Sequence, residues 1–336
     1  MSIVRASDYG ADYSLNAVPT FSIVIEWENA RFADLERTRR MLRTLRDQLI
    51  HIQAPLQPPQ IIFLYDCGII DEALVRQVVD DEFKPENLPA LTRIIPTDGL
   101  RYYEQKNFGA LQTDVEIKIF LDCDVVPEPG WLGAILESFQ NPEVGVVAGE
   151  TYIECTSLYN RAFALFWFFG LRDPSDDLRR AATFYANNVA FRADVFAQHS
   201  FPNLQTYRGQ CYVLSETLHA NGIGLFVQKR ARVSHPVPIG LWFFIARALN
   251  AGRDEILCDA HLNRRNRLLL PSICRRYKNS VVGSFQKFRK HARDVELGTV
   301  AAIAAYGIAF AYLSLKAIGE VLTFIHPNLV WRLFKV

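Results

Sequence analysis

Short apolar runs rich in β-branched residues alternate with charged, amphipathic segments over the first 121 residues, and this alternation constrains the fold more than any other feature. The apolar runs, which have the length and composition of buried strands, are residues 21–25, 61–65, 92–95 and 117–121. The charged segments between them, which suit helices, are residues 31–50, 71–80 and 104–111. Because strand, helix and strand in this order build parallel pairs, the sequence predicts an α/β fold with an open, mostly parallel sheet.

Aspartates follow two of the expected strands. Asp66 ends the second strand, and Asp122 and Asp124 follow the fourth. The carboxyl ends of the strands border the ligand crevice of an open parallel sheet, so we expect these side chains to face it. Two carboxylates separated by one residue can hold Mn²⁺ or Mg²⁺. Such an ion neutralises charge on a diphosphate leaving group. Isolated pairs of aspartates separated by one residue, however, are mostly caps of loops.

Basic residues gather near the end of the chain. With 37 basic and 36 acidic side chains the formal net charge is only +1, which argues against a general nucleic-acid binder. Ten of the basic residues fall in residues 264–293, which contain no acid. This segment is either a solvated face or a contact with an anionic membrane surface.

An uncharged stretch of 17 residues, 299–315, follows the basic segment. As a helix it covers about 26 Å of a hydrocarbon core about 30 Å thick. Extension to residue 325 adds Lys316 and Glu320, which are spaced to pair with each other. A membrane-spanning or re-entrant helix, an interfacial helix and a buried core or oligomer helix all remain open. Flanking basic residues would place the body on the cytoplasmic side.

Several short motifs occur in a fixed order along residues 21–255. The most specific is Asp122-Cys123-Asp124, which is followed by Pro129-Gly130-Trp131-Leu132. The other motifs are Glu28-Asn29, Asp66, Lys106-Asn107-Phe108-Gly109-Ala110, Asn187-Asn188-Val189-Ala190-Phe191-Arg192 and Val233-Ser234-His235-Pro236. In this order and spacing they resemble the family 2 glycosyltransferases, which are inverting sugar-nucleotide enzymes with the A-type glycosyltransferase fold.

The resemblance implies transfer of a sugar from a nucleoside diphosphate donor, uridine-linked, to an acceptor hydroxyl. It implies a divalent cation held by Asp122, Asp124 and His235. The residues expected to bind the donor are Glu28, Asp66, Lys106, Asn107, Asp122 and Asn188. Arg247 and Arg253 are further candidates, because guanidinium groups bind a diphosphate or an anionic acceptor through paired hydrogen bonds.

One departure from the family concerns the general base. The family carries a Glu-Asp pair about a dozen residues before the glycine that ends a helix, and its aspartate accepts the proton of the acceptor hydroxyl. Counting back from Gly222 places Gln210 and Cys211 at these positions, and neither is a carboxylate.

Two residues are candidates for this role. The thiol of Cys211 accepts a proton as thiolate where a cation such as Arg208 favours that form. Its helical spacing to Leu214 and Leu218 also suits a small core cysteine. Glu216 is the nearest carboxylate, about 140° around the same helix.

We therefore expect a glycosyltransferase domain at residues 15–260, a basic membrane-proximal segment at 261–298 and a hydrophobic helix at 299–325. The expected location is the cytoplasmic face of an inner or plasma membrane, by peripheral contact or a single anchor. The expected acceptor is a glycan, lipid-linked or part of an envelope polysaccharide, and the sequence leaves the oligomeric state open. Two alternatives are a non-catalytic sugar-nucleotide-binding or scaffold protein and a metal-dependent nucleotidyltransferase.

Overall fold

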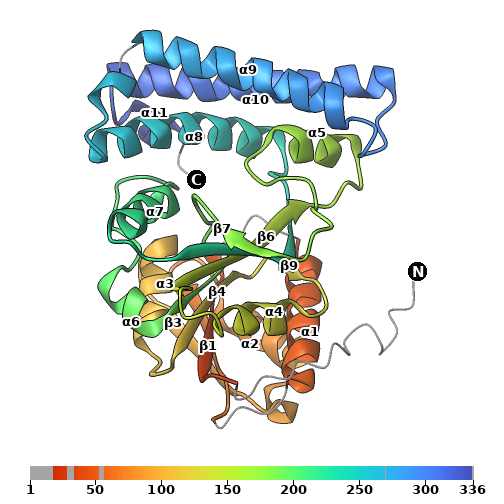
Figure 1. Cartoon of the computed structure of the whole chain (residues 1–336), viewed down its shortest axis with the longest axis vertical. Helices are drawn as coiled ribbons and strands as arrows, with labels where there is room; N and C mark the ends of the chain where they lie inside the picture. The colour runs from red at the N-terminus through yellow and green to blue at the C-terminus, as the bar shows by residue number, and fades with distance from the viewer. Residues whose placement is uncertain (1–17, 29–33, 53–56, 269, 335–336) are drawn as a thin grey trace. The chain divides into compact units, whose positions relative to one another are not determined.

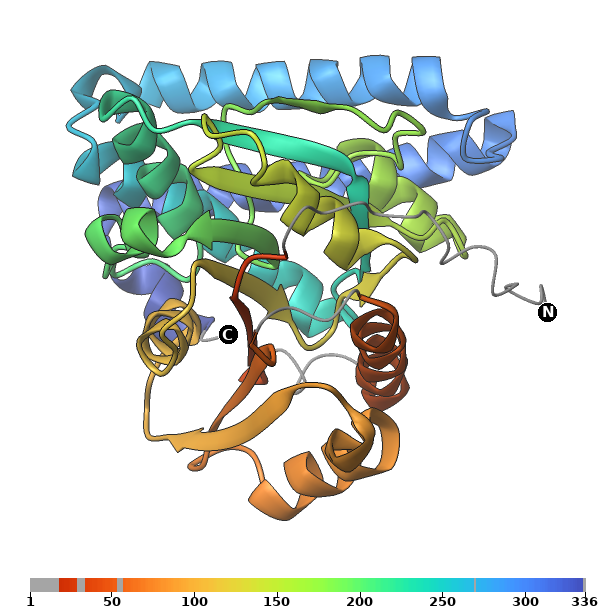
Figure 2. The same cartoon turned by 60° about the horizontal axis from the view of Figure 1, so that its bottom comes forward.

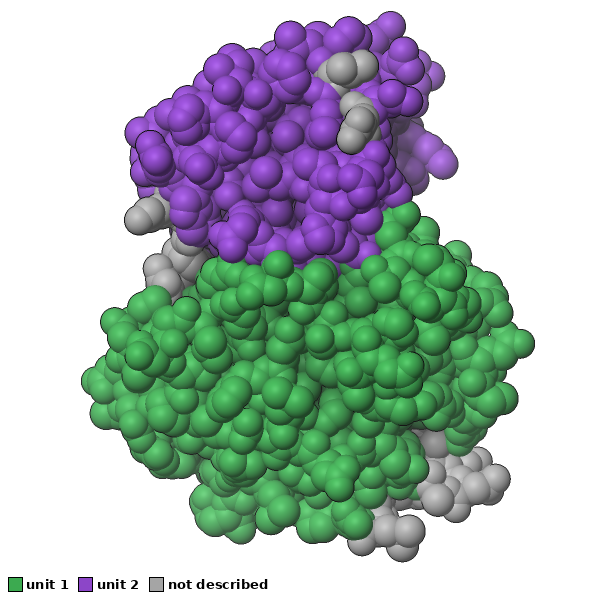
Figure 3. Space-filling model, turned by 90° about the vertical axis from the view of Figure 1, so that its left-hand side faces the viewer, with its two compact units in different colours: residues 1–151, 173–203, 214–235 green, residues 152–172, 204–213, 236–336 purple. Residues whose placement is uncertain are grey.

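The computed structural model describes residues 18–28, 34–52, 57–268 and 270–334. The chain forms two compact units (Figure 3). Unit 1 comprises residues 1–151, 173–203 and 214–235, and unit 2 comprises residues 152–172, 204–213 and 236–336. Both expected C-terminal segments, 261–298 and 299–325, thus belong to unit 2, together with residues 236–260. The expected start of the first domain, at residue 15, lies outside the described residues.

Unit 1 contains a mixed sheet of nine strands in the described residues, with the order β3-β2-β1-β4-β8-β6-β9-β5 and with β7 beside β9. The strands are β1 (Phe21–Glu26), β2 (Gln60–Asp66), β3 (Leu91–Thr97), β4 (Ile117–Asp122), β5 (Val126–Pro127), β6 (Val146–Ile153), β7 (Leu178–Arg180), β8 (Asn188–Arg192) and β9 (Leu225–His235). Strands β1 to β4 are parallel, which confirms the predicted open α/β sheet. The later pairs, β4 with β8 and β5 with β9, are antiparallel.

Helices cover both faces of the parallel strands (Figure 2). The helices of this unit are α1 (Leu35–His51), α2 (Glu72–Val78), α3 (Tyr102–Leu111), α4 (Trp131–Ser138), α6 (Ala193–Gln198) and most of α7 (Gln210–Ala220). The apolar faces of α1 and α2 share one core with alternate residues of β1 and β2, such as Ile23 and Phe63. Helix α3 lies on the other face, where Gly109 approaches Val24 and Leu64.

The helix ends differ slightly from the sequence-based expectation. Asp34 caps α1 by accepting a hydrogen bond from the backbone N–H of Glu36, so the described helix begins at Leu35. Residues 31–33 of the expected helix lie outside the described residues. Helix α3 begins at Tyr102, two residues earlier than expected, because the side chain of Glu104 accepts a hydrogen bond from the backbone of Arg101. This extra length brings Tyr102 into the helix.

The regular secondary structure in the described residues of unit 2 is helical, except for the end of β6. Its helices are α5 (Leu158–Phe166), α8 (Leu241–His261), α9 (Leu270–His291), α10 (Thr299–Ile325) and α11 (Leu329–Leu333). Helix α10 runs beside α9 and packs against α5 and α8 (Figure 1). It crosses α8 at two glycines, Gly252 and Gly319, each of which touches the backbone of the other helix.

The two charged residues of α10 pair with neighbouring helices and not with each other as expected. Lys316 Nζ lies 3.2 Å from a carboxylate oxygen of Glu255 in α8. Glu320 is buried, and its carboxylate lies 2.6 Å from the guanidinium of Arg276 in α9. The reason is geometric, because both side chains face the helices against which α10 packs. These pairs fix the rotation of α10 about its axis.

We predict that Gly319→Ala destabilises the protein, because the added Cβ would lie 2.2 Å from the carbonyl oxygen of Leu249. Overpacking of this kind typically costs about 1–3 kcal/mol, measured as a lower free energy of unfolding in denaturant. Gly307→Ala in the same helix is the matched control, since a Cβ there meets no atom within 4 Å. Alanine should stabilise that position by up to about 1 kcal/mol. Equal stability of the two variants would contradict the close crossing.

Candidate active site

The structure brings together the three residues predicted to bind a metal. Asp122 is the last residue of β4, and Asp124 lies in the turn that leads to β5. Antiparallel pairing of β5 with Val233 and Ser234 places His235, the last residue of β9, beside this turn. One ligand atom from each of the three side chains lies within 4.8 Å of the others.

The donor set of this cluster fits a divalent cation. Two carboxylates supply the hard oxygen ligands that Mg²⁺ and Mn²⁺ prefer, and an imidazole nitrogen shifts the preference toward Mn²⁺. Both aspartates are buried, so the carboxylates are largely withdrawn from solvent. Close carboxylates in such a place repel each other unless positive charge lies nearby.

Helix α3 supplies part of that positive charge. Lys106 is fully buried, and its Nζ donates hydrogen bonds to Asp122 Oδ1 at 2.7 Å and to the carbonyl of Leu121 at 3.3 Å. The hydroxyl of Tyr102 donates to the same Oδ1 at 2.7 Å and lies 3.0 Å from Oδ2. Asp122 is therefore oriented from the helix side by two donors one helical turn apart.

The motif around Lys106 is explained by packing. The side-chain amide of Asn107 donates to the carbonyl of Phe201 at 2.8 Å and accepts from its N–H at 3.1 Å. A Cβ at Gly109 would lie 2.5 Å from side-chain atoms of both Val24 and Leu64. Only glycine lets α3 come this close to the sheet, and the approach allows Lys106 to reach Asp122. Contacts of Lys106 and Asn107 with a donor stay predictions.

The other expected donor-binding residues of unit 1 lie at strand ends or inside the sheet. Asp66 ends β2, and its Oδ1 accepts the N–H of Gly68 at 2.9 Å. Glu28 follows β1, and its Oε2 is buried without a hydrogen-bond partner among the described residues. Asn29, the second residue of that motif, lies outside the described residues. Asn188 is buried, accepting from Trp131 Nε1 at 2.8 Å and donating to two backbone carbonyls, which makes it a tether between strands.

Arg37 and Tyr102 are side chains at this site that the sequence analysis did not identify. Arg37, in α1, donates to the carbonyl of Asp124 at 2.6 Å and to the hydroxyl of Ser234 at 2.9 Å. It thereby connects the two segments that carry Asp124 and His235. Tyr102 had one sequence signal, because it lies four residues before Lys106 on the same helical face. Arg37 had no such signal, since its partners are 87 and 197 residues away.

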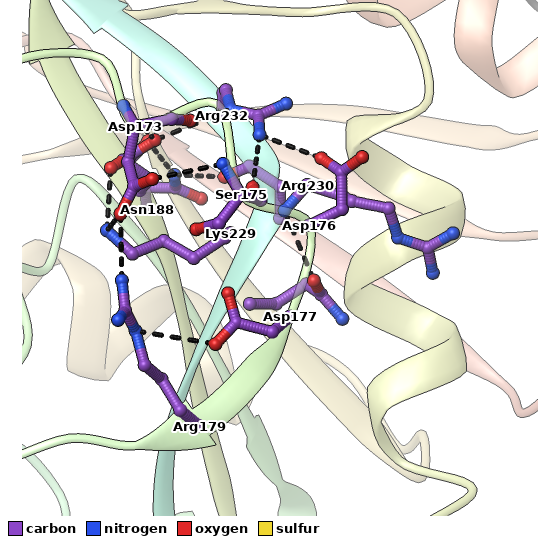
Figure 4. Close-up of polar contacts among 12 residues, drawn as sticks. Asp173, Ser175, Asp176, Asp177, Arg179, Asn188, Lys229, Arg230 and Arg232 are labelled. Carbon is purple, nitrogen blue, oxygen red and sulfur yellow. Dashed lines mark hydrogen bonds and ion pairs between the residues drawn. The ribbon is translucent and has the colours of Figure 1, made fainter.

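A network of charged residues braces β9, the strand that carries His235 (Figure 4). Lys229 Nζ lies 2.7 Å from Glu150 and 3.2 Å from Asp173, while Arg232 pairs with Asp176 at 2.8 Å. Hydrogen bonds from Ser175, and further from Lys229, hold the pKa of the Asp173 carboxyl well below its usual range. The network ties the loop at residues 173–177 to β9.

The segment with the unusual Gln210 and Cys211 lies at the start of α7, in unit 2. Cys211 is buried, as are Leu214 and Leu218, whereas Glu216 is half-buried in the part of α7 that belongs to unit 1. The two candidate bases therefore belong to different units, and their proton-transfer roles stay predictions.

A buried carboxylate on α8 binds the backbone of the residues just before this segment. Asp254 accepts hydrogen bonds from the backbone N–H groups of Tyr207 at 3.0 Å and Arg208 at 2.6 Å. Burial raises the pKa of Asp254 to about 6, although these hydrogen bonds and Arg253 oppose the shift. Arg253 is itself buried and donates to Asp254 and to the carbonyl of Gln205. Arg247 stacks on the ring of Tyr207, 4.8 Å from its centroid. Asp254 was not identified from the sequence.

Comparison with known proteins gives a family match. The model of the family described as "Glycosyl transferase family 2" matches residues 23–199. The sequence matches none of the curated proteins.

Solved structures provide a comparison of the fold. The mannosyltransferase PcManGT from Pyrobaculum calidifontis, in complex with GDP-Man and Mn²⁺, is 11% identical with a TM-score of 0.59, over 94% of this chain and 89% of that chain. GalNAc-T7 with UDP, GalNAc and Mn²⁺ is 14% identical with a TM-score of 0.49, over 69% and 51% of the two chains. S. aureus TarS in complex with UDP-GlcNAc is 12% identical with a TM-score of 0.48, over 90% of each chain. At such low identity, the first of these shows the fold alone.

We predict that Lys106→Met lowers the free energy of unfolding by about 3–5 kcal/mol, because it leaves the buried carboxylate of Asp122 without its cation. The double variant Lys106→Met with Asp122→Asn should lose less than the single variant, since no unpaired charge remains. Tyr102→Phe, the control for loss of a neutral donor, should cost about 1–2 kcal/mol. Denaturant titration of the variants measures these differences. A Lys106→Met protein as stable as the wild type would contradict the buried pair.

Proposed function

The chain belongs to glycosyl transferase family 2, and we propose from this premise that it transfers a sugar from a uridine diphosphate sugar to an acceptor hydroxyl with inversion. The observation that carries the proposal is the cluster of Asp122, Asp124 and His235 at the carboxyl ends of β4 and β9. The structure of PcManGT, which was solved with GDP-Man and Mn²⁺, supports a nucleotide-sugar donor and a divalent cation. Guanosine diphosphate sugars should therefore be compared with uridine diphosphate sugars in any test of donor binding.

We infer that Asp122, Asp124 and His235 would hold Mn²⁺ or Mg²⁺. The bound ion would neutralise the negative charge that develops on the diphosphate leaving group. In this arrangement Lys106 and Tyr102 orient the Asp122 carboxylate by hydrogen bonds. Asp66 would hydrogen-bond the nucleotide base. The Oε2 of Glu28, which has no hydrogen-bond partner among the described residues, would accept from a donor hydroxyl.

The residues expected to face the acceptor differ from the family pattern. With Gln210 and Cys211 at the positions of the acidic pair, the proton of the acceptor hydroxyl would pass to Cys211, to Glu216 or to solvent. The half-buried guanidinium of Arg247 is a candidate contact for a phosphate on the donor or the acceptor. Arg253 is a weaker candidate, because its hydrogen bonds already go to Gln205 and Asp254.

The acceptor is proposed to be a glycan, lipid-linked or part of an envelope polysaccharide. Among the residues that the structure describes, one helix, α10, is long and apolar enough to cross a membrane. The basic residues of the preceding segment support a location at the cytoplasmic face of the membrane, peripheral or held by a single anchor.

A second candidate function is sugar-nucleotide binding without turnover, because Gln210 and Cys211 replace the acidic pair. Incubation with a uridine diphosphate sugar separates the possibilities. Release of uridine diphosphate, even by slow hydrolysis, indicates a transferase, whereas release of pyrophosphate indicates a nucleotidyltransferase. Binding without any release would favour the non-catalytic alternative.

The metal cluster is tested by Asp124→Asn, which should remove the Mn²⁺-dependent part of donor affinity while the fold is kept. The variant is chosen because Asp124, unlike Asp122, does not bind the buried Lys106. Calorimetric titration of a uridine diphosphate sugar with Mn²⁺ and with a chelator measures the effect, and Asp80→Asn at an exposed position is the control. Equal wild-type affinity in both conditions would remove the metal from the proposal.

The acceptor side is tested by Cys211→Ser, Cys211→Asp and Glu216→Gln, assayed for transfer and for donor binding across pH. Cys211→Ser should impair turnover more than donor binding, and Cys211→Asp should restore or increase turnover. Loss of a true general base typically costs about 10² to 10⁴ in rate. The exposed Cys67, as Cys67→Ser, is the control. If only Glu216→Gln is inactive, the base comes from the other side of α7 and the assignment of Cys211 is wrong.

A further inference from the structure

The outward face of α10 is apolar along its whole length. The helix has 27 residues, about 40 Å, and its exposed large side chains are all apolar. Among them Val300 is 82% exposed, Ile303 69% and Ile325 71%. Both charged residues of α10 are engaged with neighbouring helices, as described above. Contiguous exposed apolar surface of this kind is typical of a site that contacts a membrane or another protein.

Helix α9, which lies beside α10, exposes basic residues in the same surface layer. Its outward positions at helical spacing are Arg275, Lys278, Val282, Phe285 and Arg289. Basic residues thus flank an exposed apolar pair, and α9 contains no acidic residue at all. This pattern is typical of helices that lie at the surface of an anionic bilayer, where apolar side chains enter the acyl boundary and basic ones meet phosphates.

Contacts between the two helices keep α10 in this layer. Tyr277 and Ser314 hydroxyls lie 2.9 Å apart, and the Tyr306 hydroxyl donates to the carbonyl of Val281 at 3.3 Å. The buried pair of Arg276 and Glu320 adds a charged contact next to Tyr277 along α9. The two helices thus pack as an antiparallel pair, and a crossing by α10 alone would break these contacts.

Crossing by the pair is strongly unfavourable, because the exposed Arg275 and Lys278 would enter the hydrocarbon region. We therefore propose that the α9–α10 pair lies in the plane of a bilayer containing anionic phospholipid. In this arrangement the uncharged face of α10 enters the headgroup–acyl boundary, and the basic residues of α9 bind headgroup phosphates. The proposal rests on the membrane location proposed above and specifies that the attachment is in the plane of the bilayer. It does not depend on sugar transfer.

Vesicle flotation tests the surface. The full chain should bind vesicles of phosphatidylcholine with phosphatidylglycerol more strongly than vesicles of phosphatidylcholine alone, and added salt should weaken the difference. Lys278→Glu with Arg289→Glu, both exposed on the outward face of α9, should weaken binding to the anionic vesicles about tenfold or more. Val300→Glu should also weaken it, whereas Leu111→Glu should not. Leu111 is the matched control, because it is equally exposed at 82% but belongs to unit 1.

Depth measurements distinguish an in-plane helix from a spanning one. Nitroxide labels are placed at Val300, Phe310, Ile318 and Ile325, in a background where the exposed Cys67 and Cys274 are serine. Similar shallow depths at all four positions are expected. A profile deepest at Phe310 and shallow at both ends would mean a spanning anchor and overturn the proposal. Failure to bind any vesicle, with a dimer in solution that Val300→Glu disrupts, would overturn it in favour of a second copy of this chain. Release of uridine diphosphate is measured separately, so failure of the proposed transfer reaction is recognised independently.

Discussion

The buried negative charge of Asp122 is the constraint on which the candidate active site depends. A carboxylate withdrawn from water is costly unless it is paired and hydrogen-bonded. Lys106 and Tyr102 supply both, and they reach Asp122 because Gly109 lets α3 approach β1 and β2 closely. The packing that builds the core of unit 1 thus also orients the first carboxylate of the cluster of Asp122, Asp124 and His235. Arg37 and the network around Lys229 act similarly on the segments that carry Asp124 and His235.

Local patterns in the sequence predicted the parallel half of the sheet and the positions of Asp66 and Asp122 at strand ends. Apolar runs and helical periodicity depend on neighbouring residues, so they can be read without the fold. The contacts of Arg37 and Asp254 could not be predicted, because their partners come from distant segments. The pairing of Lys316 and Glu320 shows the same limit. Spacing on one helix suggested that they pair with each other, but packing against α8 and α9 assigned each a different partner.

The chain has the residues expected for the metal side of its family and departs from the expected pattern on the acceptor side. Gln210 and Cys211 stand where an acidic pair is expected. Asp254, a buried carboxylate on α8, is occupied with the backbone of Tyr207 and Arg208. Both oxygens of Asp254 are used, which makes it a structural anchor for the start of α7. Unit 2, to which this segment belongs, also presents the basic and apolar surface of α9 and α10. A membrane-bound acceptor would relate the altered acceptor-side residues to the proposed membrane surface of α9 and α10.

The most direct test of the central claim is anomalous diffraction from crystals of the full chain grown with Mn²⁺ and a uridine diphosphate sugar. We expect an anomalous peak bounded by Asp122, Asp124 and His235, with the diphosphate of the donor beside it. Loss of the peak in Asp124→Asn crystals, with Lys106 still bound to Asp122, would support the assignment of ligands. A peak elsewhere, or a bound donor without any peak at the three side chains, would contradict the claim that this cluster holds the cation for sugar transfer.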